Sequence, residues 1–149
     1  MNKLKLHTIG FTKKSAERFF ALLREHRIER LVDIGLRPGG QLAGFTKQSD
    51  FPYFLTHLAN CEYLHFPTLA PNDDILSTYR KDHDWGRYVM RFEALMDERN
   101  IPVSLDWPFF AEKACCLLCS EAMPEQCHRR LIAERFARVW PGTEVVHIV

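Results

Sequence analysis

The stretch Ala114-Cys115-Cys116-Leu117-Leu118-Cys119 is apolar at nearly every position, and a polar loop and a helix-length segment follow it. A continuous apolar run of this length is typical of a strand that is buried on both faces of a parallel sheet. The next segment, 124–139, has helical spacing and ends before Pro141-Gly142. A buried strand that leads straight into a helix indicates an α/β fold.

The same alternation extends outward in both directions. Short apolar stretches at 4–9, 30–34, 63–66 and 144–149 predict further strands, and segments with helical spacing separate them. Strands separated in this way form βαβ units with right-handed crossovers. We therefore expect residues 1–149 to form a single three-layer α/β domain, Rossmann-like or flavodoxin-like, with a mainly parallel sheet of about five strands.

Length and composition agree with this class. The chain has 149 residues, which suits one domain. Hydrophobic residues make up 46% and charged residues 26%, as in ordinary globular proteins and unlike disordered ones. The formal net charge of +1 argues against non-specific polyanion binding as the main function but leaves room for a local phosphate site.

The five cysteines raise the question of disulfides. Their odd number, the lack of an apolar leader and a core that needs no cross-links favour a reducing compartment. No stretch approaches the roughly 20 apolar residues of a membrane span. We expect a cytoplasmic protein with free thiols, in which Cys61, Cys115 and Cys116 are packing residues.

Candidate functional residues follow the predicted strands. In parallel α/β sheets ligands bind beyond the carboxyl ends of the strands, which three segments reach here: 8–12, 33–45 and 119–129. The candidate catalytic residues are Cys119, Glu121, Cys127, His128 and Asp33. The candidate ligand-binding residues are Thr8, Gly10, Arg37 and Arg129.

The segment after the buried strand carries the richest chemistry. Cys127, His128 and Arg129 are expected in the first turn of a helix, where positive potential lowers a thiol pKa and attracts anions. In one hypothesis Cys119 or Cys127 is a nucleophile that His128 assists. In another, Arg129 and the helix start bind phosphate and the cysteines only pack.

A third hypothesis is a metal site built from Cys116, Cys119, Cys127 and His128. Their spacing, C-x2-C followed by x7 and C-H, matches no zinc motif. Residues three apart on a strand also point to opposite faces, which separates Cys116 from Cys119. We therefore expect no metal and leave the cofactor open.

The segments 33–45 and 8–12 contribute a carboxylate, a guanidinium and a turn. Asp33 at a strand end is a candidate acid–base group, and Arg37 begins a long Gly-rich loop of a kind that is usually functional or mobile. Thr8 and Gly10 end the first strand, where the glycine either approaches a ligand or only permits the turn.

Aromatic residues at helical spacing are interpreted as structural. Trp85, Tyr88 and Phe92 fall on one helix face and are expected in the core rather than in a base-stacking platform. The histidines other than His128 are scattered without ligand spacing.

A set of motifs runs along most of the chain: Thr8-Ile9-Gly10-Phe11-Thr12, Asp33-Ile34, Gln41-Leu42-Ala43-Gly44-Phe45-Thr46-Lys47, Leu69-Ala70-Pro71, Leu117-Leu118-Cys119-Ser120-Glu121, Pro124-Glu125, Cys127-His128-Arg129-Arg130 and Glu144-Val145-Val146-His147-Ile148. With these motifs the sequence resembles the bacterial family named domain of unknown function 488. The resemblance implies an α/β fold and no settled activity. It also implies an arginine after Asp33-Ile34, where this chain has Gly35; either Arg37 takes over that role or a ligand contact is missing.

These observations favour a small enzyme that acts on an anionic, phosphate-bearing ligand such as a nucleotide or a nucleic-acid component. In this hypothesis Arg37, Arg129 and the helix start hold the anion, and Asp33 and Glu121 are acid–base groups. A non-enzymatic nucleotide- or anion-sensing module would need the arginines but not the thiols. A thiol redox or sulfur-transfer protein would need one cysteine with a depressed pKa. The oligomeric state stays open.

Overall fold

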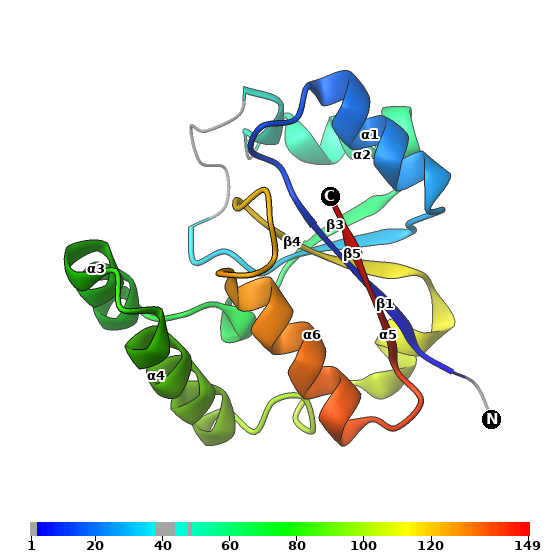
Figure 1. Cartoon of the computed structure of the whole chain (residues 1–149). Helices are drawn as coiled ribbons and strands as arrows, with labels where there is room; N and C mark the ends of the chain where they lie inside the picture. The colour runs from blue at the N-terminus through cyan, green and yellow to red at the C-terminus, as the bar shows by residue number, and fades with distance from the viewer. Residues whose placement is uncertain (1–2, 38–43, 48) are drawn as a thin grey trace.

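The computed structural model describes residues 3–37, 44–47 and 49–149, and strands and helices alternate through it (Figure 1). In chain order, with η for 3-10 helices, the elements are β1 (Lys5–Gly10), α1 (Ala16–Glu25), β2 (Arg30–Asp33), η1 (Gly44–Thr46), α2 (Phe51–Ala59), β3 (Glu62–His65), η2 (Pro67–Leu69), α3 (Asp73–Asp82), α4 (Trp85–Glu98), α5 (Trp107–Glu112), β4 (Cys115–Cys119), α6 (His128–Val139) and β5 (Glu144–Ile148). Much of the predicted Gly-rich loop, residues 38–43, lies outside the described residues. None of the helices in the described ranges is both long and apolar enough to cross a membrane.

The strands form a five-stranded, all-parallel sheet in the order β3-β2-β4-β1-β5. This confirms the predicted α/β class and the parallel sheet. β4 is the central strand, and all of its residues are buried. A strand with a neighbour on each edge and helices on each face meets no water, which explains why Cys115–Cys119 contains no polar residue other than cysteine.

Helices cover both faces of the sheet and give the predicted three layers (Figure 1). α1 and α2 share one hydrophobic core with Cys116 and Leu118. α4, α5 and α6 share the other core with Leu117 and Cys119. Successive side chains of β4 therefore alternate between the two cores, as the pleat of a strand requires.

The connections between the strands change face around β4. The chain leaves β1 and β2 through α1 and α2 on one face, whereas it leaves β4 through α6 on the other face. A crevice forms at the carboxyl ends of neighbouring strands whose chains leave to opposite faces. Because β4 has such a neighbour on each side, the topology predicts one crevice between β2 and β4 and another between β4 and β1.

The helix after β4 begins later than the sequence pattern predicts. α6 starts at His128 rather than near residue 124, and Cys127 is its N-cap residue rather than part of its first turn. The backbone of Cys127 is extended, with φ −137° and ψ 140°, and its sulfur accepts the backbone N–H of Arg129 at 3.5 Å. This capping geometry fixes the helix start and turns the Cys127 sulfur toward the sheet edge.

Candidate functional site

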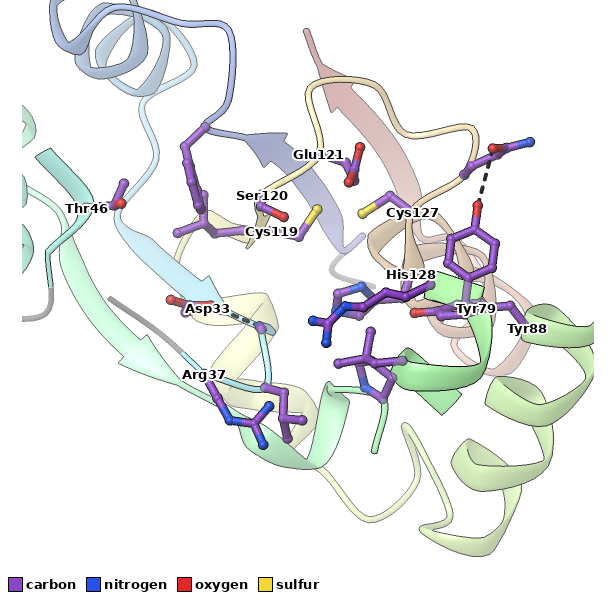
Figure 2. A pocket seen from close by; sticks show the side chains of 18 of the residues that line it. Asp33, Arg37, Thr46, Tyr79, Tyr88, Cys119, Ser120, Glu121, Cys127 and His128 are labelled. Carbon is purple, nitrogen blue, oxygen red and sulfur yellow. Dashed lines mark hydrogen bonds between the residues drawn. The ribbon is translucent and has the colours of Figure 1, made fainter. Parts of the chain in front are cut away.

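A cavity of about 430 Å³ opens in the crevice between the carboxyl ends of β2 and β4 (Figure 2). Its lining comes from both strand ends, from the loop after β4, from α3 and from the first residues of α4 and α6. The volume suits a small-molecule ligand. The cavity thus lies where the topology of an α/β sheet places a binding site.

Six of the nine predicted site residues line this cavity: Asp33, Arg37, Cys119, Glu121, Cys127 and His128. They come from segments far apart in the sequence and meet because parallel strands end at the same edge. The other three, Thr8, Gly10 and Arg129, are not among its lining residues and surround the crevice between β4 and β1. The six lining residues stay candidates for ligand contact, whereas the roles of Thr8, Gly10 and Arg129 must be sought outside the cavity.

Two thiols face each other in the cavity wall (Figure 2). Their sulfurs point toward each other from the end of β4 and from the N-cap of α6. Burial raises the pKa of the Cys119 thiol, but the neighbouring Cys127 thiol and the charge of Arg129 outweigh burial, so the pKa lies below its ordinary value. The neighbouring Cys119, together with burial, raises the pKa of Cys127. Cys119 is therefore the more readily ionised thiol of the pair.

Arg129 is fully buried beside this pair, with Nη1 3.4 Å from the Cys119 sulfur. Its Nε donates to the Thr8 hydroxyl at 3.1 Å, and its Nη1 and Nη2 donate to the carbonyl oxygens of Glu121 and Ala122. The guanidinium therefore ties β1 to the loop after β4 and fills the second crevice. We infer that its charge stabilises the ionised form of Cys119. The sequence had instead suggested that Arg129 binds the anion of a ligand.

Thr8 and Gly10 have structural roles at the end of β1. The Thr8 hydroxyl accepts a hydrogen bond from Arg129 and shares a second hydrogen bond, of 2.6 Å, with Nδ1 of His147. A Cβ on Gly10 would overlap the carbonyl oxygen of Glu121. Only glycine lets the loop after β4 cross β1 at this point, so Gly10 approaches a loop rather than a ligand.

Asp33 contributes a buried carboxyl group from the end of β2. Its Oδ2 accepts a hydrogen bond from the Tyr63 hydroxyl at 2.6 Å, and its Oδ1 accepts the N–H of Gly35 at 2.9 Å. Burial raises the pKa of Asp33, although both hydrogen bonds oppose the shift. A positioned carboxyl group with a raised pKa is suited to donate a proton to a ligand.

The His128 ring is turned toward the end of β2, where its Nε2 lies 2.7 Å from the carbonyl oxygen of Ile34. Because a carbonyl can only accept, Nε2 carries the proton. Burial lowers the pKa of His128 to about 4. A ring that is neutral at neutral pH supplies no positive charge to a thiolate. The cation beside Cys119 is thus Arg129, and the assistance to a cysteine nucleophile predicted for His128 stays a prediction.

An aromatic wall made of Tyr79, Trp85 and Tyr88 lines the cavity from α3 and α4. Trp85 and Tyr88 are stacked, with 4.8 Å between ring centroids and an interplanar angle of 15°, and Tyr79 lies 5.2 Å from Tyr88. Phe92 continues the stack into the core and is fully buried. The interpretation of this helix face as core is right for Phe92 and incomplete for Trp85, because the first turn of α4 extends past the core to the cavity.

Exposed basic side chains, Arg37, Arg80 and His83, stand at the mouth of the cavity. Arg37 pairs with Asp73 at 2.5 Å, whereas Arg80 makes no ion pair within residues 3–37, 44–47 and 49–149. The sequence analysis missed both Arg80 and His83. They belong to the segment after the carboxyl end of β3, so the strand-end rule, applied to the third strand as well, points to them.

Metal ligation finds no support in the residues that the structure describes. Among them, no group of three or more His, Cys, Asp or Glu side chains could hold a metal ion. Cys116 packs with α1 and α2, whereas Cys119 lines the cavity on the other side of the sheet. This confirms that the two cysteines point to opposite faces.

Comparison with protein-family models identifies the family of the chain. The family model described as "Domain of unknown function DUF488" matches residues 15–136. No curated protein and no solved structure matches the chain. All six predicted residues that line the cavity fall inside the matched range.

Proposed function

Because the chain belongs to the DUF488 family, which is described only as a domain of unknown function, we propose its function from the cavity itself. The chain is an enzyme that binds an anionic, phosphate-bearing ligand of the nucleotide class and attacks it with the Cys119 thiolate. The observation that carries the proposal is the placement of Cys119. It lines the cavity while Arg129 and Cys127 favour its ionised form.

The aromatic wall supports a ligand with a flat ring. Trp85 is half-buried and is stacked on Tyr88, so one face of the pair is held rigidly at the cavity. A nucleobase stacks on such a surface with a gain of about 1–3 kcal/mol. The hydroxyl of Tyr79 and the amide of Gln126, 3.5 Å apart, lie beside this surface and offer polar contacts to a base.

The basic mouth supports an anionic end on the same ligand. Arg80 has no carboxylate partner in the described part of the chain, and the Arg37–Asp73 pair is exposed. An exposed ion pair contributes little to stability, so a phosphate can replace Asp73 as the partner of Arg37 at small cost. Two guanidinium groups then bind the phosphate with charge-assisted hydrogen bonds.

The thiolate supplies the nucleophile for a two-step transfer. The Cys119 sulfur forms a bond to an electrophilic carbon or phosphorus atom while the bond from that atom to its leaving group breaks, and Asp33 or Glu121 protonates the leaving group. Water then displaces the sulfur, and the same carboxylate takes the proton of the water. Both the thiolate and the carboxylic acid are restored.

Calorimetric titration with nucleoside monophosphates tests the ligand class. Trp85→Leu should weaken binding about tenfold or more, because it removes the stacking surface. Trp107→Leu is the matched control, since Trp107 is half-buried on α5 and is not a lining residue. Wild-type protein that binds none of the nucleotides, or equal losses in the two variants, would refute the proposal.

The Cys119→Ser variant separates an enzyme from a sensing module. It keeps the shape of the cavity but lacks a thiolate at neutral pH. The proposal predicts that it still binds the nucleotide and no longer converts it, as followed by chromatography of the mixture. Conversion at the wild-type rate would refute the nucleophile. Binding without conversion by the wild type would favour the sensing module instead.

A further inference from the structure

The placement of the two thiols, whose sulfurs point toward each other, indicates a second property of this site. We propose that hydrogen peroxide oxidises Cys119 and Cys127 to an intramolecular disulfide, and that a reductant reverses this change. The inference goes beyond the proposed function, because it needs neither a nucleotide nor the transfer reaction.

The two sulfurs are held together by the fold. Cys119 ends β4, Cys127 is the N-cap of α6, and the loop of residues 120–126 brings them to one cavity wall, where their sulfurs point toward each other (Figure 2). Arg129 fixes both, with its Nη1 3.4 Å from the Cys119 sulfur and its backbone nitrogen 3.5 Å from the Cys127 sulfur. Two sulfurs that point toward each other and share Arg129 as a neighbour are placed to form a disulfide.

The cavity gives a small oxidant a route to this pair alone. All five cysteines are buried, but only Cys119 and Cys127 among them line the cavity, whereas Cys61, Cys115 and Cys116 pack inside the two cores. Burial raises the pKa of Cys61 and of Cys115 to about 12, so these stay protonated thiols, and thiols react slowly with peroxide. The pair therefore has the access that the other cysteines lack, and Cys119 is its more readily ionised member.

The chemistry balances with hydrogen peroxide as the oxidant. The Cys119 thiolate attacks one peroxide oxygen, the O–O bond breaks, and a sulfenic acid and hydroxide form. Cys127 then attacks the Cys119 sulfur, the S–O bond breaks, and its oxygen leaves as water with the Cys127 proton. The two electrons lost by the sulfurs end on the peroxide oxygens. A dithiol reductant reverses the change.

Peptide mapping of the wild-type protein tests this directly. The protein is treated with hydrogen peroxide, its free thiols are alkylated, and it is cleaved after glutamate. Cleavage at Glu112, Glu121, Glu125 and Glu134 places the two cysteines on separate peptides, 113–121 and 126–134. We expect these peptides to be linked through Cys119, with Cys115 and Cys116 alkylated, and we expect dithiothreitol to release them.

Variants separate the two roles in the pair. Cys127→Ser should stop the reaction at a sulfenic acid on Cys119, which dimedone traps, and Cys61→Ser should give the wild-type linkage. The proposal is overturned if peroxide leaves the two peptides unlinked, if the linkage uses Cys61, Cys115 or Cys116, or if dimedone leaves Cys119 unlabelled in the Cys127→Ser variant. Because the mapping uses wild-type protein, a variant that fails to fold leaves the test intact. A linked pair in a protein that binds no nucleotide would support this inference while refuting the proposed function.

Discussion

The Nη1 atom of Arg129 lies 3.4 Å from the sulfur of Cys119, and only the cysteine lines the cavity. The guanidinium fills the crevice between β4 and β1, which leaves the crevice between β2 and β4 open for a ligand. A buried cation that cannot reach the ligand still favours the thiolate, since its field acts through a medium of low polarity. The buried guanidinium and the ligand cavity thus lie side by side at the carboxyl edge of the sheet.

Gly10 is predicted to be necessary for this arrangement. Gly10→Ala should lower the free energy of unfolding by about 3 kcal/mol, because its Cβ would overlap the Glu121 carbonyl and displace the loop that Arg129 holds. Gly86→Ala is the control, since a Cβ there meets only an ordinary contact at 3.5 Å, and it should stabilise α4 by up to about 1 kcal/mol. Urea denaturation measures both. Similar effects of the two substitutions would contradict this account of Gly10.

The buried His128 should make the protein sensitive to acid. Its pKa is about 4 in the folded protein, below the value of about 6.5 for an unfolded chain, so the neutral ring favours folding above pH 6.5. This contribution is lost as the pH falls from about 6.5 to about 4. The loss is at most about 3 kcal/mol, because part of the ring faces the cavity.

His128→Gln is the variant that isolates this effect. A glutamine amide can still donate to the Ile34 carbonyl but does not titrate. Denaturant unfolding at several pH values should show a smaller loss of stability between about pH 7 and pH 4 in the variant than in the wild type, since other groups titrate alike in both. Equal losses would show that His128 is not buried as a neutral ring.

The sequence predicted the sheet and the meeting of Asp33, Cys119 and His128, because the pattern of a buried strand is local and parallel strands end at one edge. It could not predict that Arg129 turns inward. At a helix start an arginine is ordinarily exposed and free to bind anions. Its burial here depends on the space left by Gly10 and on the Thr8 hydroxyl, which lie about 120 residues away in the chain.

The aromatic wall escaped prediction for a related reason. Helical spacing shows that Trp85, Tyr88 and Phe92 share a face but not where along the helix that face leaves the core. The position of α4 beside α6 decides this, and it depends on packing between distant segments. Arg80 was missed because the strand-end rule was not applied to β3, whose carboxyl end leads toward α3.

Arg80 is predicted to bind the anionic end of the ligand. Arg80→Gln should weaken binding of a nucleoside monophosphate about tenfold and reduce its dependence on salt, because a charge-assisted hydrogen bond to phosphate is removed. Arg18→Gln serves as the control, since Arg18 lies on α1 and pairs with Glu25. Titration calorimetry at two salt concentrations measures both variants. If Arg18→Gln weakens binding as much as Arg80→Gln does, the phosphate site is not at α3.

The central claim is that Cys119 is a thiolate in an open cavity, and its alkylation rate as a function of pH tests it most directly. The modified residue is identified by mass spectrometry of the peptide 113–121 after reaction of the folded protein with iodoacetamide. We predict that the rate for Cys119 titrates with a pKa below the ordinary thiol value of about 8.5. Cys127→Ala should move this pKa upward, and Cys61→Ser should leave it unchanged. A Cys119 that titrates at or above about 8.5, or that stays unmodified in the folded protein, would contradict the account.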